Sequence, residues 1–272
     1  MTFGQAPPHL SPANSVDDWA HDYITTKSLQ TKCRPASPPA EFSLHPPLAP
    51  AFPGRPVELV DSAEKPRSFK PGSLVRPEAR AQLNHKFWHH ELQAAELFCW
   101  AFLRFPDAEA EFRRGLIKIA GDELRHMSLY EQRIQSEGYE LGSFPVRDWF
   151  WDRLPTCQSP LQFVALMGMG LEAANLEHTQ RFAQWFRSAG DEASARVQDQ
   201  VGLEEINHVR FSNHWFATWS GGITFEGWKA TLPPPLSPLL MKGKTIARER
   251  RLKAQFPASF IDELSAWQPD KV

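Results

Sequence analysis

Two glutamate–histidine pairs in this chain have the spacing of paired metal ligands on a helix. Glu123-x-x-His126 and Glu205-x-x-His208 each place a carboxylate and an imidazole three residues apart. At that spacing both side chains lie on the same face of an α-helix. One such pair is usually a surface ion pair. Two in one chain are more specific, and they predict a site for divalent metal ions.

Each pair is preceded by another glutamate at a matched distance. Glu91 lies 32 residues before Glu123, and Glu172 lies 33 residues before Glu205. If each interval is an antiparallel hairpin with a central turn, the two glutamates of a hairpin lie at the same height. Two hairpins together then supply four carboxylates and two imidazoles, which suits two adjacent iron or manganese ions.

The elements that must position these residues are visible as helical periodicity. Amphipathic patterns predict four helices, over residues 78–104, 108–137, 159–187 and 191–218. Pro106 and Gly190 mark the two short turns that the hairpins require. The intervening stretch 138–158 is long enough to run the length of a bundle. The prediction is an all-α fold, a ferritin-like four-helix bundle of two helical hairpins with a long crossover.

The acidic residues interrupt the apolar face of each predicted helix. Several carboxylates buried together repel one another, so they must be protonated or neutralised by cations. We therefore expect Glu123 and Glu205 to bridge two metal ions, and Glu91 and Glu172 to be terminal or shifting ligands. The predicted metal ligands are Glu91, Glu123, His126, Glu172, Glu205 and His208.

Other polar residues lie near these positions. Glu96 and Glu177 each follow a predicted ligand by five residues, which turns them about 140° away around the helix. We expect them to contact ligands or to join helices. Asp122 and Glu204 precede the bridging glutamates and either support the site or lie in solvent. Tyr130, one turn after His126, either gates the site or packs in the core.

Further histidines and aromatic residues surround the first predicted ligand. His89 and His90 point about 200° and 100° away from Glu91, so we exclude them, with His85, from the ligand set. One group of aromatic residues either lines a hydrophobic cavity or, as is more common, packs in the core: Trp88, Phe98, Trp100, Trp149, Phe150 and Trp151.

The composition is that of an ordinary globular protein with no general attraction to nucleic acid. The 272 residues are 42% hydrophobic and 23% charged, with a net charge of −2. The first residues have neither the basic nor the apolar part of a secretory signal, and no apolar run is long enough for a membrane span. Cys33, Cys99 and Cys157 form no CxxC pair. A cytoplasmic protein without membrane contact is the expectation.

The chain divides into three parts by composition. About half of the 24 prolines lie before residue 75, which predicts a Pro-rich extended arm over residues 1–75, either wrapped on the domain or disordered. Residues 76–220 form the bundle, and residues 221–272 a C-terminal extension with a helix over 237–255. That extension carries one basic cluster, through which RNA contact is an alternative that the sequence does not favour: Lys242, Lys244, Arg248, Arg250, Arg251 and Lys253.

Several stretches resemble a known family. HHELQAAELF, AGDELRHMSLYEQRI, LEAANLEH and LEEINHVRFSNHWF are similar to an uncharacterised bacterial ferritin-like family, distantly related to the non-haem di-iron tRNA hydroxylase. The resemblance covers roughly residues 50–220, and the six ligand positions match without substitution. It implies a ferritin-like fold and a di-iron centre, and it supplies no substrate.

These observations together predict a di-iron oxidoreductase. Two iron ions, or a manganese–iron pair, would react with dioxygen as co-substrate to hydroxylate or otherwise oxidise a small molecule or modified nucleoside. The residues predicted to be catalytic are Glu91, Glu123, Glu172 and Glu205. An external electron donor is required, and a homodimer is compatible with the sequence. The alternatives are a ferroxidase or peroxide-scavenging iron-handling protein, and a non-catalytic interaction module stabilised by metal.

Overall fold

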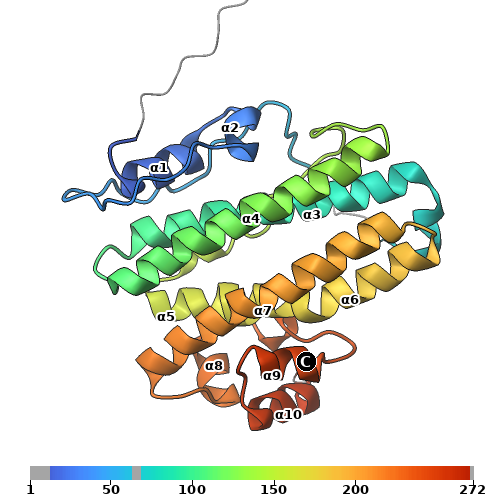
Figure 1. Ribbon diagram of the computed structural model, residues 1–272. Helices are drawn as coiled ribbons and strands as arrows, with labels where there is room; N and C mark the ends of the chain where they lie inside the picture. The colour runs from blue at the N-terminus through green and yellow to red at the C-terminus, as the bar shows by residue number, and fades with distance from the viewer. Residues whose placement is uncertain (1–12, 63–68, 270–272) are drawn as a thin grey trace, which may run out of the picture.

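Helices make up the regular structure of this protein. A computed structural model describes residues 13–62 and 69–269, and within these ranges no strand forms; one isolated bridge pairs Asp61 with Val146. Four long helical segments lie side by side (Figure 1). The α-helices among them are α3 (Pro77–Arg104), α4 (Ala110–Ser136), α6 (Ala173–Ser188) and α7 (Glu192–Ser220).

Two antiparallel hairpins build the bundle, as predicted. α3 turns into α4 after Phe105, and α6 turns into α7 at Gly190, whose φ of 80° favours glycine. Asp191 caps the start of α7 by accepting a hydrogen bond from the Ser194 amide. In Figure 1, α3 and α7 run in one direction, and α4 and α6 run in the other. α3 is therefore antiparallel to α6.

The third predicted helix is a composite rather than a continuous α-helix. It begins with α5 (Pro160–Phe163), continues as a π-helix, η3 (Val164–Glu172), and ends as α6. Gly168 lets η3 approach α7 closely, because a Cβ there would lie 1.8 Å from the Ser212 hydroxyl oxygen. π-Helical segments are frequent at functional sites. This one ends at Glu172, a predicted ligand.

The crossover between the hairpins lies against α3. Its only regular segment is a short 3₁₀ turn, η2 (Leu154–Thr156). The side-chain amide of Gln93 forms two hydrogen bonds with the crossover. Its oxygen accepts one from the Phe150 amide, and its nitrogen donates one to the Arg147 carbonyl. Trp151 of the crossover is itself buried. The segment thus connects the two hairpins as the predicted long crossover.

The N-terminal arm differs from the extended segment that its prolines predict. It contains two helices, α1 (Val16–Thr25) and α2 (Leu29–Cys33), before an irregular Pro-rich stretch and a 3₁₀ turn, η1 (Pro71–Val75). Both helices fall in a stretch without proline, which explains why they form. Asp17 of α1 pairs with Arg113 of α4 at 2.7 Å, and both are buried. The arm is therefore packed on the bundle.

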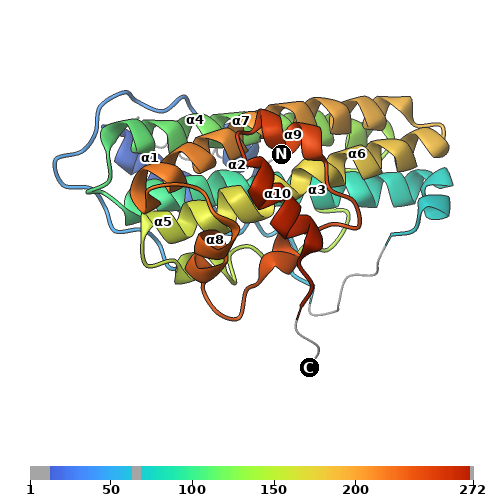
Figure 2. The same ribbon diagram turned by 90° about the horizontal axis from the view of Figure 1, so that it is seen from below.

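The C-terminal extension consists of short helices rather than one long one. They are α8 (Phe225–Thr231), a 3₁₀ turn, η4 (Pro238–Leu240), α9 (Arg248–Lys253) and α10 (Ala258–Ala266). The prediction of a helix over 237–255 is wrong, because Gly243 weakens helix in its middle and the chain turns there. Figure 1 shows these helices beneath α5, α6 and α7, and in the view from below in Figure 2 they lie in front of the bundle. In the described ranges no helix is both long and apolar enough to cross a membrane.

Candidate metal centre

The six predicted ligands converge in the middle of the bundle. They form two overlapping groups, in each of which one potential ligand atom per residue lies within 4.8 Å of the others. Both groups contain Glu123 and Glu205. We call the six residues together the carboxylate–histidine centre; the first group adds Glu91 and His126, and the second adds Glu172 and His208.

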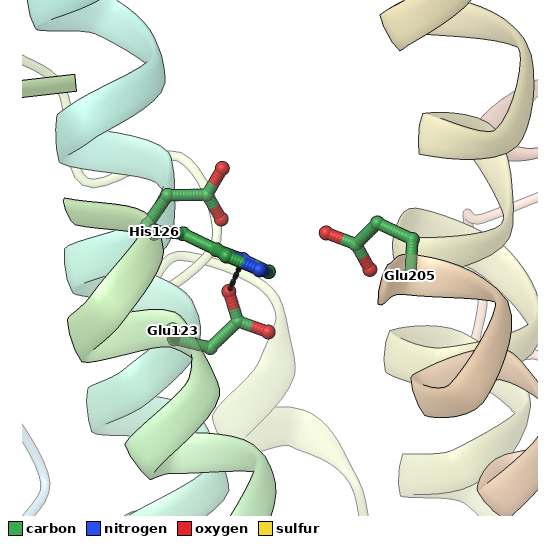
Figure 3. A group of neighbouring side chains, drawn as sticks. Glu123, His126 and Glu205 are labelled. Carbon is green, nitrogen blue, oxygen red and sulfur yellow. Dashed lines mark hydrogen bonds and ion pairs between the residues drawn. The ribbon is translucent and has the colours of Figure 1, made fainter. Parts of the chain in front are cut away.

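The sharing of two glutamates has a direct geometric meaning. Glu123 comes from α4 and Glu205 from α7, and their side chains point toward one another across the bundle (Figure 3). Each group alone offers three carboxylates and one imidazole, a donor set suited to first-row metal ions. Two shared carboxylates between two such groups are the arrangement expected of adjacent metal sites.

Three buried atoms in the centre have close neighbours but no hydrogen bond within the described residues. They are Glu123 Oε1, Glu205 Oε2 and His208 Nδ1. His208 Nδ1 lies 3.0 Å from Glu123 Oε1 and 3.2 Å from Glu205 Oε2, distances at which a well-directed hydrogen bond would form. The atoms converge without being aimed at one another. Ligands directed at a common cation have this geometry.

The outer nitrogen of each histidine contacts a carboxylate of the opposite helix. His126 Nε2 lies 2.8 Å from Glu204 on α7, and His208 Nε2 lies 3.4 Å from Asp122 on α4. Arg125 pairs with both of these acids. A carboxylate on one ring nitrogen fixes the orientation of the ring and leaves the other nitrogen, Nδ1, facing the centre. Of the two roles considered for Asp122 and Glu204, the geometry favours contact with the histidines.

The terminal glutamates carry an electrostatic cost in the protein alone. Burial, followed by the negative charge of Glu123, raises the pKa of Glu91 well above its usual range. Burial and the negative charges of Glu205 and Glu123 raise the pKa of Glu172 likewise. Both side chains therefore bind a proton more readily than an exposed carboxylate does when no cation is present.

The histidines partly substitute for missing positive charge. Burial alone would lower the pKa of His126, but hydrogen bonds to Glu123 and Glu204 and the charges of Glu123 and Glu91 raise it to about 10. Burial would raise the pKa of Glu123, but the charge of His208 and the hydrogen bond from His126 hold it well below its usual range. Without a cation, the centre offsets its negative charge by binding protons on its imidazoles and terminal carboxyls.

This donor set fits two divalent cations. Cations would replace the protons on the histidine Nδ1 atoms and on Glu91 and Glu172, and would neutralise all four carboxylates. They would also satisfy the three atoms that lack hydrogen bonds. Each observation is independent of the spacing from which the ligands were predicted.

Glu96 was predicted either to contact the metal ligands or to join bundle helices, and it does neither. It is fully buried and binds the arm: its Oε1 lies 2.6 Å from Lys32 Nζ and 2.6 Å from Arg55 Nη1, and its Oε2 accepts a hydrogen bond from Trp151 Nε1. Arg55 also pairs with Asp148 of the crossover. We call these five residues the Glu96 ion-pair cluster. It fastens the arm and the crossover to α3.

Glu177 has the corresponding role for the C-terminal extension. The Arg251 guanidinium donates hydrogen bonds to both of its oxygens, at 2.7 and 2.8 Å, and the Ala247 amide donates a third. Arg251 is fully buried and also donates to the Met241 carbonyl. The sequence did not identify Lys32, Arg55 or Arg251 as partners. No local pattern marks them, because each is distant in sequence from the acid it contacts.

The other residues singled out in the sequence have structural partners. Tyr130 is buried, and its hydroxyl accepts a hydrogen bond from Gln198. His89 lies 3.4 Å from Asp148. Most of the aromatic group packs in the core, whereas Phe150 lies against His90 with ring centroids 5.1 Å apart. In the basic cluster of the extension, five residues contact carbonyl or carboxylate groups of the chain itself: Lys242, Arg248, Arg250, Arg251 and Lys253.

Comparison with known proteins gives a family but no activity. The sequence matches the family described as "Protein of unknown function (DUF455)" over residues 13–262. An uncharacterized protein of Haemophilus influenzae is 28% identical over 174 residues, which cover 61% of this chain and 59% of that protein. The match thus spans less than two thirds of the relative's length. No solved structure matches.

Proposed function

The chain belongs to the DUF455 family, and we propose that it is a ferritin-like di-iron oxidoreductase that uses dioxygen to oxidise an organic substrate. The observation that carries this proposal is the pair of overlapping ligand groups that share Glu123 and Glu205. Four buried carboxylates and two imidazoles between antiparallel helical hairpins are the donor set of di-iron and di-manganese carboxylate proteins.

Each ligand has a role that follows from its group. Glu123 and Glu205 would bridge the two ions, since both groups contain them, and each ion would take one terminal glutamate and one histidine. Glu91 and His126 would serve one ion, and Glu172 the other together with His208. When bound, a pair of iron ions supplies the redox chemistry that oxidation by dioxygen requires; a manganese–iron pair is the alternative.

The surrounding residues prepare the ligands for this task. Glu204 and Asp122 orient the imidazoles of His126 and His208, so that little reorganisation accompanies metal binding. Tyr130 remains a neutral phenol, because burial and then the negative charges of Glu91 and Glu205 raise its pKa well above the usual range. The apolar side chains around the centre keep bulk water from the reacting atoms.

The proposal includes a substrate and an external electron donor. Reduction of dioxygen to water takes more electrons than hydroxylation of a substrate supplies, so the remaining electrons must come from the external donor. RNA remains an unfavoured partner, since the basic cluster of the extension is occupied by contacts within the chain. A small molecule or modified nucleoside is the expected substrate.

Anaerobic loading with ferrous iron tests the proposal. The loaded protein, freed of unbound metal, is analysed for iron and then exposed to oxygen while its optical spectrum is recorded. We expect about two irons per chain and a transient oxygen-dependent absorbance. Glu123→Gln is expected to retain less iron, whereas Glu111→Gln, an exposed residue of the same helix, serves as the matched control.

The other outcomes identify the alternatives. Repeated oxidation of added ferrous iron with release of ferric product would favour iron handling over substrate oxidation. Stable metal without any reaction with oxygen would favour a structural module. Absence of bound metal in the wild-type protein would overturn the proposal.

A further inference from the structure

Four cationic or potentially cationic side chains face the junction of α3 and α6. Lys86 and His90 are four residues apart on α3, and His178 and Arg181 are three apart on α6. Residues at these spacings share a helix face. Phe87 and Phe182 pack edge to face between the two helices, with centroids 4.9 Å apart. We call these four residues the α3–α6 cation cluster.

The cluster lies toward one end of the bundle from the carboxylate–histidine centre. Lys86 precedes Glu91 by five residues, and His178 follows Glu172 by six. Because α3 and α6 are antiparallel, both displacements point toward the same end of the bundle (Figure 1). With a rise of about 1.5 Å per residue, Lys86 and His178 lie about 7.5–9 Å from the centre along the bundle axis; one of the other two members lies nearer and the other farther. The same spacings turn Lys86 and His178 about 120–140° away from the ligands around their helices, so the cluster lies on a different face.

The described residues provide this cluster with no negative charge. Neither a side-chain hydrogen bond nor an ion pair joins Lys86, His90, His178 or Arg181 to another described residue, and the buried Nε of Arg181 has no hydrogen-bond partner there. Burial, then the positive charges of Arg181 and Lys86, lowers the pKa of His178 to about 4. The charge of Lys86 thus reaches a residue of the facing helix.

The walls of the cluster resemble a binding site in their chemistry. The Arg181 guanidinium lies over the rings of Phe182 and Trp185, at 4.8 and 5.7 Å from their centroids, which fixes its position. Phe150 of the crossover covers His90. His90, His178 and Arg181 are half-buried, and Lys86 is exposed. Fixed, partly dehydrated donors bind anions more strongly than freely hydrated ones.

The basic cluster of the C-terminal extension provides a contrast. Two of its exposed cations have carboxylate partners within the chain: Arg248 pairs with Asp262, and Lys253 pairs with Glu249 at 2.6 Å. Those contacts hold the extension together. The α3–α6 cation cluster has no such partners among the described residues.

We infer that the α3–α6 cation cluster binds an anionic ligand through a phosphoryl or carboxylate group. This inference does not depend on the proposed oxidation. Lys86 and Arg181 supply the charge, and the two histidines donate hydrogen bonds.

Titration of the metal-free full-length protein tests the anion site. Inorganic phosphate and acetate are added at constant ionic strength, with sodium chloride as the reference, and binding is followed by calorimetry and by the NMR signals of the histidine rings at fixed pH. The double variant Lys86→Gln/Arg181→Gln removes the two charges. Lys118→Gln/Arg196→Gln, two exposed residues elsewhere, removes the same charge as the matched control.

Phosphate binding that weakens at least about tenfold in the Lys86/Arg181 variant, but not in the control, is the expected result. Stronger binding of phosphate than of acetate identifies a phosphoryl group, and the converse identifies a carboxylate. Equal binding by the two variants, or no binding beyond that of chloride, overturns the inference. Perturbation of the His178 signal in the wild type tests the site without any substitution.

The two proposals fail separately. Iron content of the Lys86→Gln/Arg181→Gln variant after anaerobic loading is expected to equal that of the wild type. Anion binding without iron binding would leave the anion site and refute the di-iron centre. Iron binding without anion binding would do the reverse.

Discussion

Glu91 and Glu96 lie five residues apart on α3, both buried, and they differ in what surrounds them. Glu91 faces another acid, Glu123, whereas Glu96 contacts Lys32 and Arg55. Burial, reinforced by Glu123, raises the pKa of Glu91. Burial acts on Glu96 in the same direction, but the charges of Lys32 and Arg55 outweigh it and lower its pKa. A buried, ionised carboxylate requires a cation nearby. Basic side chains of the protein supply that cation to Glu96 and not to Glu91.

The second hairpin repeats the contrast. Glu172 belongs to the carboxylate–histidine centre, and five residues later Glu177 binds Arg251 of the C-terminal extension. Five residues turn a side chain about 140° around the helix, so the first acid faces the bundle interior and the second faces outward. The outward acids fasten the two extensions. The comparison shows that burial of an acid indicates a metal site only when no basic side chain reaches it.

Removal of a shared acid is expected to have the largest effect. Glu123→Ala takes one donor from both ligand groups, so bound iron should fall from about two per chain to less than one. Helix content measured by circular dichroism should change little, because the remaining acids repel one another less. Full metal occupancy in this variant would show that the acids of the carboxylate–histidine centre do not differ from Glu96 and Glu177 in binding metal.

Substitution of the arm acid should affect stability instead. Glu96→Gln leaves the fully buried Lys32 without its counter-charge, which costs about 3–5 kcal/mol. Chemical denaturation of the metal-free protein measures the free energy of unfolding, with Glu111→Gln as the control. Iron content per folded chain is expected to stay at the wild-type level; loss of iron there would link Glu96 to the centre.

A smaller effect is expected from the acids that orient the histidines. Asp122→Asn removes the negative charge beside His208 Nε2 and should weaken metal affinity about 10–100-fold. Competition with a chelator of known affinity measures the change. An affinity equal to that of the wild type would assign Asp122 to the solvated role.

The contributions of Glu96 and of His126 to stability should depend on pH in opposite directions. The pKa of Glu96 is lowered from 4.5, so its contribution to stability is present above pH 4.5 and is lost as the pH falls through the lowered value. The pKa of His126 is raised from 6.5 to about 10, so its contribution to the metal-free protein is present below pH 6.5 and is lost as the pH rises through about 10. The unfolding penalties of Glu96→Gln and His126→Gln, measured against pH, should therefore shrink at opposite ends of the scale. Penalties that shrink at the same end would contradict the contrast.

The smallest change in stability is expected at Glu91. Burial and the charge of Glu123 disfavour the ionised form of Glu91 in the metal-free protein, so the neutral amide of Glu91→Gln removes no favourable charge and should alter the free energy of unfolding by less than about 1 kcal/mol. Iron retention should nevertheless fall. A destabilisation as large as that of Glu96→Gln would mean that Glu91 already has a cation in the protein alone.

The helical periodicity of the sequence was enough to predict the long helices and the residues of the site. The apolar stripes predicted the long helices to within a few residues, since the 3.6-residue repeat depends only on neighbouring positions. The same repeat placed four glutamates on inward faces: Glu91, Glu123, Glu172 and Glu205. In each hairpin the two glutamates are equally far from the connecting loop, so they were expected at the same height along the bundle. The structure brings these four together with both histidines.

Elements that depend on distant contacts were predicted less well. Helix α1 forms in an arm whose prolines indicate extended chain, and Arg113 of α4 pairs with its Asp17. The helix expected over 237–255 is interrupted between η4 and α9, and Arg251 of α9 pairs with the distant Glu177. The π-helix that ends at Glu172 could not be predicted, because every residue before Glu172 in it is apolar or glycine. Such a stretch has no alternation of polar and apolar residues from which a π-helix could be told from an α-helix.

The sequence by itself determined the four long helices and the six residues that converge, because helical geometry and matched distances from two turns are local rules. Only the tertiary structure decided which buried acids have a counter-charge. Glu91 and Glu96 differ in this respect because Lys32 and Arg55 reach Glu96 from the arm, 64 and 41 residues away along the chain. Charge pairing in a low-dielectric interior depends on distance in space, and no pattern of neighbouring residues encodes that distance.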